Sequence, residues 1–289
     1  MATGSSIEWT EATWNPSTGC TKISPGCKNC YAERMAGRQQ AMGSKKYAAG
    51  FEYTEHQDTL QVPIRWARGR MIFVNSMSDM FHENATTAFV ASCFYSMLLA
   101  PQHTYQILTK RPDRMAEFSM WFEKATGVKI PPNIWMGTSI ESSFQLDRLQ
   151  YLRWTRCHTR FVSFEPLIGD IGPANLSKID WAIIGGESGP GHRPVRREWI
   201  TELIDTCRRQ KTAVFFKQWG GATPKAGGRE IDGRTYDEYP KTSKVPKPWM
   251  IDDRDVFVGK VVEAAGNTVW TGPGGKAWDG WSGGTGGGR

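Results

Sequence analysis

Short apolar, β-branched runs recur along this chain, and segments with helical periodicity separate most of them. Six such runs occupy residues 71–75, 105–109, 134–138, 160–164, 181–185 and 213–217, and a first strand is expected near 12–18. Strands that alternate with helices predict parallel βαβ units. The nearly continuous apolar character of the runs is typical of strands buried on both faces of a sheet.

Five segments have the pattern of helices that would connect these strands. They span residues 32–42, 87–99, 112–124, 142–154 and 196–210. Seven strands are too few for a complete eight-unit barrel. The sequence therefore predicts an α/β fold with a partial (βα)6-type TIM-like barrel of parallel strands, an additional strand and a C-terminal extension. A doubly wound sheet is the alternative.

The domain organisation follows from changes in composition along the chain. Residues 1–220 form the predicted barrel core, with 43–70 as an insertion, and 221–289 form a C-terminal extension rich in Gly and Trp. An Asp232–Gly233 turn in this extension predicts a β-hairpin. The last seven or so residues are expected to be disordered.

Polar residues follow almost every predicted strand, and in parallel α/β folds this is the edge where ligands bind. They are Asn75, Ser76, Ser78, Asp79 and His82; Lys110 and Arg111; Thr138, Ser139 and Glu141; Glu165; Gly186, Glu187, Ser188 and His192; and Lys217, Gln218 and Trp219. Each alone is as well explained by a helix cap or a solvated loop. Together they predict a polar, charged mouth on one edge of the sheet.

Three cysteines lie between the first predicted strand and the first predicted helix. Cys20, Cys27 and Cys30 have the spacing C-x6-C-x2-C, and Tyr31 follows the last of them. A closed structural zinc site and an ordinary iron–sulfur carrier each use four protein ligands. Three thiolates therefore predict a metal centre with one open coordination position. The remaining cysteines, Cys93, Cys157 and Cys207, are interpreted as buried thiols.

Composition limits where the protein works and what it binds. The sequence has no run of 18 apolar residues and no signal-like N-terminus, which predicts a cytoplasmic protein that does not enter a membrane. Reduced thiols in that compartment favour metal ligation over disulfides. A net charge of +7 allows attraction to nucleic acid, although a merely basic soluble protein explains this charge equally well.

The cysteine motif and several further stretches resemble the radical S-adenosylmethionine (SAM) superfamily, and within it an uncharacterised phage-associated family. The matching stretches are TWNPSTGC, CYAERMAGR, NSMSDMF, LTKRP, GTSIES, SFEPLIG and GGESG, and they span residues 9–220. The common motif of the superfamily is C-x3-C-x2-C. Cys27 and Cys30 match its second half, whereas Cys20 departs by three extra residues.

The resemblance implies a [4Fe–4S] cluster on Cys20, Cys27 and Cys30, with SAM chelating the fourth iron. The reduced cluster would cleave SAM to a 5′-deoxyadenosyl radical that abstracts a hydrogen atom from substrate. It also implies SAM contacts after several strands. Asn75, Ser76 and Asp79 would meet the amino end, Thr138, Ser139 and Glu141 the ribose, and Gly186 and Glu187 the adenine or methionine part.

The remaining mouth residues are assigned to substrate. Lys110, Glu165 and Lys217 are candidate catalytic residues, and Arg111, Gln218 and Trp219 are candidate substrate contacts. Cations there suit an anionic substrate such as a nucleotide. The phage resemblance and the basic charge favour isomerisation of a hypermodified thymine in phage DNA, in the host cytoplasm, with flavodoxin or ferredoxin as electron donor.

Two other functions fit the same residues. One is a radical lyase that repairs pyrimidine photoproducts in DNA. The other is a DNA-binding protein without enzymatic activity, stabilised by zinc on the three cysteines and a remote histidine such as His82.

Overall fold

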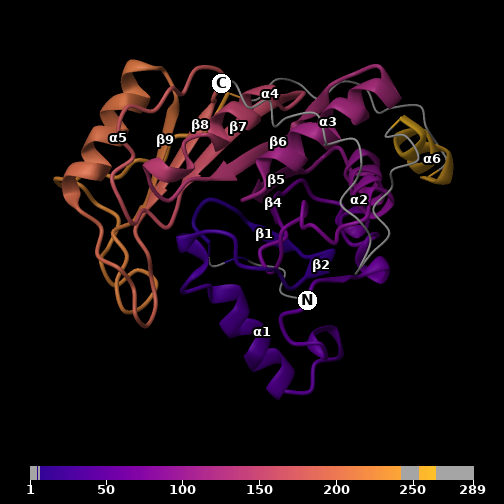
Figure 1. Ribbon diagram of the computed structural model, residues 1–289, viewed down its shortest axis with the longest axis horizontal. Helices are drawn as coiled ribbons and strands as arrows, with labels where there is room; N and C mark the ends of the chain where they lie inside the picture. The colour runs from indigo at the N-terminus through magenta and orange to yellow at the C-terminus, as the bar shows by residue number, and fades with distance from the viewer. Residues whose placement is uncertain (1–4, 6, 242–253, 265–289) are drawn as a thin grey trace, which may run out of the picture.

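The computed structural model describes residues 5, 7–241 and 254–264, and its main element is a curled half-barrel sheet of seven parallel strands (Figure 1). The strand order is β1-β4-β5-β6-β7-β8-β9. These strands are β1 Ala12–Trp14, β4 Met71–Val74, β5 Thr104–Thr109, β6 Ile130–Ser139, β7 Cys157–Phe164, β8 Trp181–Gly185 and β9 Ala213–Gln218. Every neighbouring pair is parallel.

The strand order runs in one direction along the sheet. A doubly wound sheet has a point at which the order reverses, and this sheet has none. The predicted partial barrel is therefore confirmed as a mixed α/β fold with a curled parallel sheet, and the doubly wound alternative is wrong.

The helices that connect the strands cover the outer face of the curled sheet, and α1 stands apart from them (Figure 1). The six helices of the described chain are α1 Tyr31–Ala41, α2 Thr87–Leu99, α3 Pro112–Thr126, α4 Arg148–Trp154, α5 Arg197–Arg209 and α6 Arg254–Ala264, and α6 follows the last strand. Local signals fix their ends. The Thr86 side chain accepts a hydrogen bond from the amide of Phe89 and caps α2. Pro112 begins α3, and Gly127 ends it in the left-handed conformation, with φ 76°.

Alternate residues of each strand point to opposite faces of the sheet. The outward residues, such as Val74, Ile107 and Val162, pack with the helices in the main core. The inward residues form a second, smaller core without helical residues. It consists of Trp9, Phe73, Trp135, Phe161, Trp181, Ile183 and Phe215. Aromatic rings thus fill the amino end of the concave face, and the polar residues lie at its carboxyl end.

The predicted strand 12–18 is divided in two. β1 ends at Trp14, and β2 (Ser17–Thr18) pairs with β3 (Thr54–Glu55) in a separate antiparallel sheet. Pro16 lacks the amide hydrogen that a continued ladder needs. The partner strand β3 comes from the predicted insertion 43–70, which also contributes the short helical turns η2 Lys45–Tyr47, η3 Gln57–Thr59 and η4 Pro63–Arg65.

Two other predicted elements differ from the structure. The predicted helix 142–154 is divided into the turn η5 Ser143–Gln145 and the shorter α4, and the amide of Ser143 donates to the carbonyl of Asp170. The Asp232–Gly233 turn forms, with φ values of 52° and 71°. Its hairpin is limited to one bridge between Ile231 and Arg234.

The C-terminal extension packs on the core. Residues 236–238 bond the free edge of β9: the amide of Phe216 donates to Tyr236, and that of Glu238 to Val214. Phe257 of α6 is fully buried against the rings of Tyr95 and Phe122. The disorder predicted for the last seven or so residues lies outside the described residues. Within the part of the chain that the structure describes, no helix is long and apolar enough to cross a membrane.

Candidate functional site

The carboxyl end of the concave face carries an acid–base pair. Glu165 follows β7 and Lys217 lies near the end of β9, with 3.1 Å between Lys217 Nζ and Glu165 Oε1. The hydroxyl of Ser163 donates to Glu165 Oε2 at 3.2 Å. Gly185 leaves the space for this carboxylate, because a Cβ there would lie 2.5 Å from Glu165 Oε1. Two predicted catalytic residues are therefore in contact.

The three cysteines lie on one loop, residues 19–30, which we name the cysteine loop. Gly19 opens it at φ 79°, where a Cβ would lie 2.0 Å from the carbonyl oxygen of Glu52, so only glycine fits. The amide of Cys20 donates to the carbonyl of Phe51 at 3.1 Å. The turn η1 (Pro25–Cys27) lies in the middle of the loop, and α1 begins directly after Cys30.

Glu141, which follows β6, holds the middle of the cysteine loop. Its carboxylate is fully buried and accepts a hydrogen bond from the Ser24 hydroxyl at 2.8 Å. It pairs with Arg148 at 3.0 Å and with Lys110 at 3.6 Å. A Cβ at Gly26 would lie 2.4 Å from Glu141 Cγ, so the loop backbone rests directly on this side chain.

Glu187, which follows β8, holds the end of the loop. It accepts hydrogen bonds from Asn29 Nδ2 at 3.1 Å and from the amide and Nε of Arg193, each at 2.8 Å. Although burial opposes ionisation, the hydrogen bonds from Arg193 and Asn29 lower the pKa of Glu187 below its usual value. Arg193 Nη1 also donates to the carbonyl of Pro25 at 3.0 Å.

Asp79 and Arg111 hold the start of the loop. Arg111 Nη1 lies 3.3 Å from Asp79 Oδ2, and both side chains are buried. Arg111 Nη2 donates to the Thr21 hydroxyl at 2.7 Å, and Nη1 donates to Cys20 Sγ at 3.6 Å. Polar groups from three parts of the sheet edge therefore hold the cysteine loop across the mouth.

The pKa values of Cys20 and Cys27 are shifted in opposite directions. Burial, with the charge of Asp79, raises the pKa of Cys20 to about 12. Burial also acts on Cys27, but the charge of Lys110 and hydrogen bonds from Ile23 and Ser24 outweigh it and lower the pKa of that thiol. Positive charge next to the loop thus favours a thiolate at Cys27.

The donor set suits an iron–sulfur cluster in type and position. Cys20, Cys27 and Cys30 are free and half-buried at the sheet edge, whereas the other three cysteines are buried in the core, as predicted. Soft thiolates select iron–sulfur clusters or zinc. As the loop lies, no three His, Cys, Asp or Glu side chains among the described residues form a group that could hold a metal ion.

His82 has other partners. Its ring is buried, stacks on Tyr53 with 4.5 Å between ring centroids, and accepts a hydrogen bond from the amide of Asn84 at Nδ1. Nε2 lies 3.2 Å from the hydroxyl of Thr21. Burial, with the charge of Arg111, lowers the pKa of His82 to about 4. Both ring nitrogens are therefore engaged without a metal.

The other predicted SAM contacts mostly bond to the backbone or to neighbouring loops. Asn75 has φ 59° and donates to the Ser17 hydroxyl at 3.0 Å, and the Ser76 hydroxyl donates to Asn15 at 3.2 Å. Thr138 donates to the carbonyl of Thr109 at 2.9 Å. Ser139 is buried, and its carbonyl accepts from Arg148 at 2.7 Å.

Of the predicted residues at the end of β9, Gln218 and Trp219 do not join the acid–base pair. Gln218 Nε2 donates to the carbonyl of Gly186 at 3.1 Å, which ties β8 to β9. Trp219 donates to the carbonyl of Glu230 at 2.8 Å, and so faces the C-terminal extension. Gly186 has no room for a side chain, because a Cβ would lie 2.1 Å from the carbonyl oxygen of Trp219.

Sequence reasoning missed the residues that fasten the loop. In the sequence, Arg148 is indistinguishable from the solvent-exposed charges of a helix, yet its side chain is buried and paired with Glu141. Arg193 and Asn29 meet only in the folded chain, because 164 residues separate them in the sequence. The only available signal was the basic and polar character of the residues that flank the GGESG stretch.

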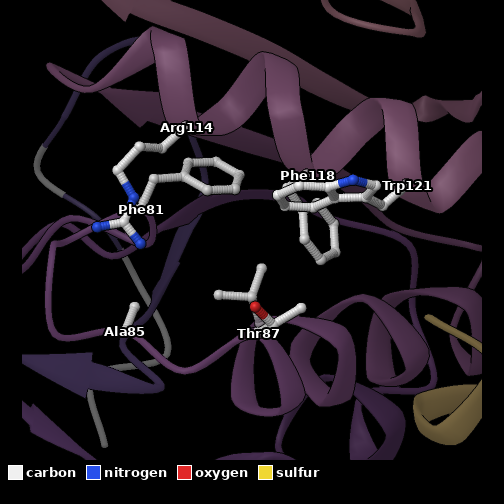
Figure 2. A pocket seen from close by; sticks show the side chains of 7 residues that line it. Phe81, Ala85, Thr87, Arg114, Phe118 and Trp121 are labelled. Carbon is white, nitrogen blue, oxygen red and sulfur yellow. The ribbon is translucent and has the colours of Figure 1, made fainter. Parts of the chain in front are cut away.

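A small pocket lies between two of the covering helices. Figure 2 shows it between α2 and α3, with Arg114 beside Phe81 at one end and Trp121 at the other. Its volume of about 20 Å³ holds one water molecule, not a cofactor. Burial lowers the pKa of Arg114 to about 9.

Comparisons with known proteins give one match. The model of a family described as "Protein of unknown function (DUF5131)" matches residues 4–240, which is most of the chain and includes the cysteine loop and every strand of the half-barrel. No curated protein and no solved structure matches the chain.

Proposed function

We propose that this chain, which belongs to the DUF5131 family, is a radical SAM enzyme whose [4Fe–4S] cluster is held by Cys20, Cys27 and Cys30. We also propose that the half-barrel is a (βα)6-type TIM-like barrel with one additional strand. The substrate proposed is a hypermodified thymine in phage DNA, which the enzyme isomerises.

One observation carries the proposal. The cysteine loop lies across the carboxyl edge of a parallel half-barrel, and its three thiols are the only cysteines of the described chain outside the hydrophobic core. Cys27 lies close enough to Lys110 to be affected by its charge, and Cys20 accepts a hydrogen bond from Arg111. Ligand sites of α/β barrels occur at this edge.

The cluster and SAM, when bound, would supply a carbon radical that takes a hydrogen atom from substrate. The residues of the chain would position and shield this chemistry. Glu141, Glu187 and Arg111 would hold the cysteine loop, since each already has a hydrogen bond or ion pair to it or to its flanking arginine. Direct SAM contacts from Asn75, Ser76, Asp79, Thr138, Ser139, Glu141, Gly186 and Glu187 remain predictions.

Glu165 and Lys217 are the proposed substrate contacts on the concave face. They offer a hydrogen-bond acceptor and a cation side by side, 3.1 Å apart. Such a pair can bind a polar substituent on a base and exchange a proton with it. Lys110 and Arg111 each pair with a carboxylate as well, so their proposed attraction for an anionic substrate depends on how these pairs rearrange.

Anaerobic purification and reconstitution test the cluster. We expect a brown protein with absorbance near about 400 nm and about four iron atoms per chain. Alanine at Cys20, Cys27 or Cys30 should abolish iron binding, whereas Cys207→Ala, which removes a core thiol, should retain it. A colourless protein that contains zinc would contradict the proposal and favour the zinc-stabilised DNA-binding alternative.

The substrate is tested with the reduced protein, SAM and DNA, followed by detection of 5′-deoxyadenosine. Hypermodified thymine DNA is the expected substrate, and irradiated DNA tests the alternative of a photoproduct lyase. Glu165→Gln should leave iron content unchanged and raise KM for the substrate about tenfold, as expected for the loss of one charge-assisted hydrogen bond. Failure of every nucleic acid to promote product formation would contradict a DNA substrate.

A further inference from the structure

Helix α1 buries few of its side chains, although it begins directly after Cys30. Of its eleven residues only Ala32 and Ala36 are buried, and they contact Met77 in a small separate cluster. Two alanines bury little apolar surface, so α1 gains little from packing. Figure 1 shows α1 extending away from the half-barrel and its covering helices.

One side of α1 carries a stripe of exposed apolar side chains that includes one cation. Tyr31, Met35, Arg38 and Met42 recur at intervals of four, three and four residues, which places them within about 60° of one another around the helix. The exposed fractions are 51% for Tyr31, 40% for Met35 and 78% for Met42, and the hydroxyl of Tyr31 donates a hydrogen bond to the carbonyl of Ser76. Ile23 of the cysteine loop is also exposed, at 44%.

Most of the net charge of the protein lies in the segment of the chain that contains this stripe. Residues 20–50 contain six lysines and arginines and one acidic residue, Glu33, which is paired with Lys22 at 2.7 Å. This segment therefore holds five of the seven net positive charges of the chain. Exposed apolar side chains surrounded by one sign of charge are typical of a binding surface for a partner of opposite sign.

We propose that the exposed face of α1 is the docking surface for an acidic one-electron donor protein, a proposal that rests on the proposed cluster. The donor would pass one electron to the cluster; the donor is oxidised, the cluster is reduced, and no bond or proton is transferred. A docked protein must bring its redox group close to the cluster. Tyr31 is the residue that follows the proposed ligand Cys30 in the chain, so the α1 surface begins next to the cluster.

Other occupants fit this surface less well. A second copy of the chain would bring two sets of six cations together. Residues 265–289 contain two basic residues and only one acid, Asp279, and so offer little complementary charge. Nucleic acid would suit the cations but not the three exposed apolar side chains of the stripe.

The test uses a pair of matched double variants of the iron-loaded chain. Met35→Glu with Arg38→Glu reverses the charge on the exposed face of α1. Met120→Glu with Lys124→Glu makes the same change in charge on α3, where Met120 is 39% exposed and Lys124 is exposed in the last helical turn, as Arg38 is in α1. Because the two pairs match in charge and are similar in exposure and helix position, the comparison isolates the surface.

Cluster reduction is followed by loss of absorbance after mixing with reduced flavodoxin, reduced plant-type ferredoxin or dithionite. We expect the α1 variant to be reduced at least about tenfold more slowly by the proteins, since attraction between opposite charges is lost. It should be reduced by dithionite as fast as wild type. The α3 variant should behave as wild type with all three reductants.

Several outcomes would overturn this docking surface. The first is an equal rate of reduction of both variants by the donor proteins. The second is a wild-type cluster that is reduced by dithionite but by neither flavodoxin nor ferredoxin. The third is a wild-type dimer in sedimentation that is disrupted only in the α1 variant. Loss of affinity for duplex DNA in the α1 variant, with donor rates unchanged, would assign the face to nucleic acid. A wild-type chain without iron would instead refute the proposed function itself, and the docking proposal with it.

Discussion

At the scale of single residues, the site is dominated by charges buried in pairs. Glu141 is fully buried and contacts Arg148, Lys110 and the cysteine loop at once. Burying such groups is costly unless every charge has a partner. The stability of the site therefore depends on each member of the network.

Glu141→Gln tests this dependence. The substitution keeps the shape of the side chain but leaves Arg148 buried without a counter-charge, so we expect the free energy of unfolding to fall by about 3 kcal/mol. Iron loading should also fall, because Ser24 loses a charged acceptor. Glu123→Gln is the control, since Glu123 pairs with Arg156 at the surface and should cost under about 1 kcal/mol. Equal urea midpoints for the two variants would contradict the argument.

His82 makes stability depend on pH. Its pKa is lowered to about 4 in the folded chain, while the unfolded chain keeps the ordinary value of about 6.5. As pH falls from 6.5 to 4, only the unfolded state takes up the proton, so the folded state loses stability at up to about 1.4 kcal/mol per pH unit. Above about pH 6.5 this loss is absent.

Urea unfolding between pH 7 and 4.5 measures the effect. His82→Asn keeps an acceptor near the amide of Asn84 but does not titrate, so its unfolding free energy should fall less steeply with pH than that of wild type. Parallel curves for the two proteins would show that His82 does not carry the dependence.

At the scale of elements, the sequence predicted the strands and helices well. β8 begins and ends where the apolar run predicted, and α2 matches its predicted span. The errors arose where a contact distant in sequence overrides the local pattern. β1 ends early because the insertion supplies β3 as a partner for β2. The predicted helix 142–154 is divided, and α4 begins only at Arg148.

The site was predicted less completely, for a related reason. Strand-end positions follow from local pattern, so the sequence alone could place Glu165 and Lys217 at the same edge of the sheet. The bonds of Asn29 and Arg193 to Glu187 join residues far apart in sequence, and no local periodicity encodes them. Such contacts depend on how the loops fold over the sheet edge.

Two glycines in different elements should respond in opposite directions to alanine. Gly37 lies within α1, where an added Cβ would have no neighbouring atom within 4 Å, so Gly37→Ala should stabilise the protein by up to about 1 kcal/mol. Gly137 in β6 faces Phe161, whose ring would lie 2.5 Å from the new Cβ. Gly137→Ala should cost about 1–3 kcal/mol by overpacking. The thermal unfolding midpoints of both variants test these expectations. A Gly137→Ala variant that is more stable than wild type would contradict the described packing.

At the scale of the whole molecule, α6 joins the fold beyond the region that the family match covers. Residues 4–240 match the family, whereas α6 begins at Arg254 and packs on α2 and α3 through Phe257. An additional helix of this chain therefore packs on the region that the family model covers.

Phe257→Ala measures what that helix contributes. Removing a fully buried ring should lower the free energy of unfolding by about 3–5 kcal/mol, as large core truncations do. Lys260→Ala, at an exposed position of the same helix, should change it by less than about 0.5 kcal/mol. A small effect at Phe257 in urea unfolding would show that α6 is not part of the cooperative core.

The sequential order of the strands has a consequence for how the protein is made. Each strand of the half-barrel pairs with the one that precedes it in the large sheet, so no strand must wait for a partner from the far end of the chain. The sheet can therefore grow from β1 as the ribosome releases the chain. β9 is the last strand to join, and its outer side is the final edge of the sheet. Residues 236–238 then cover that edge, which protects the newly made protein from pairing with its neighbours.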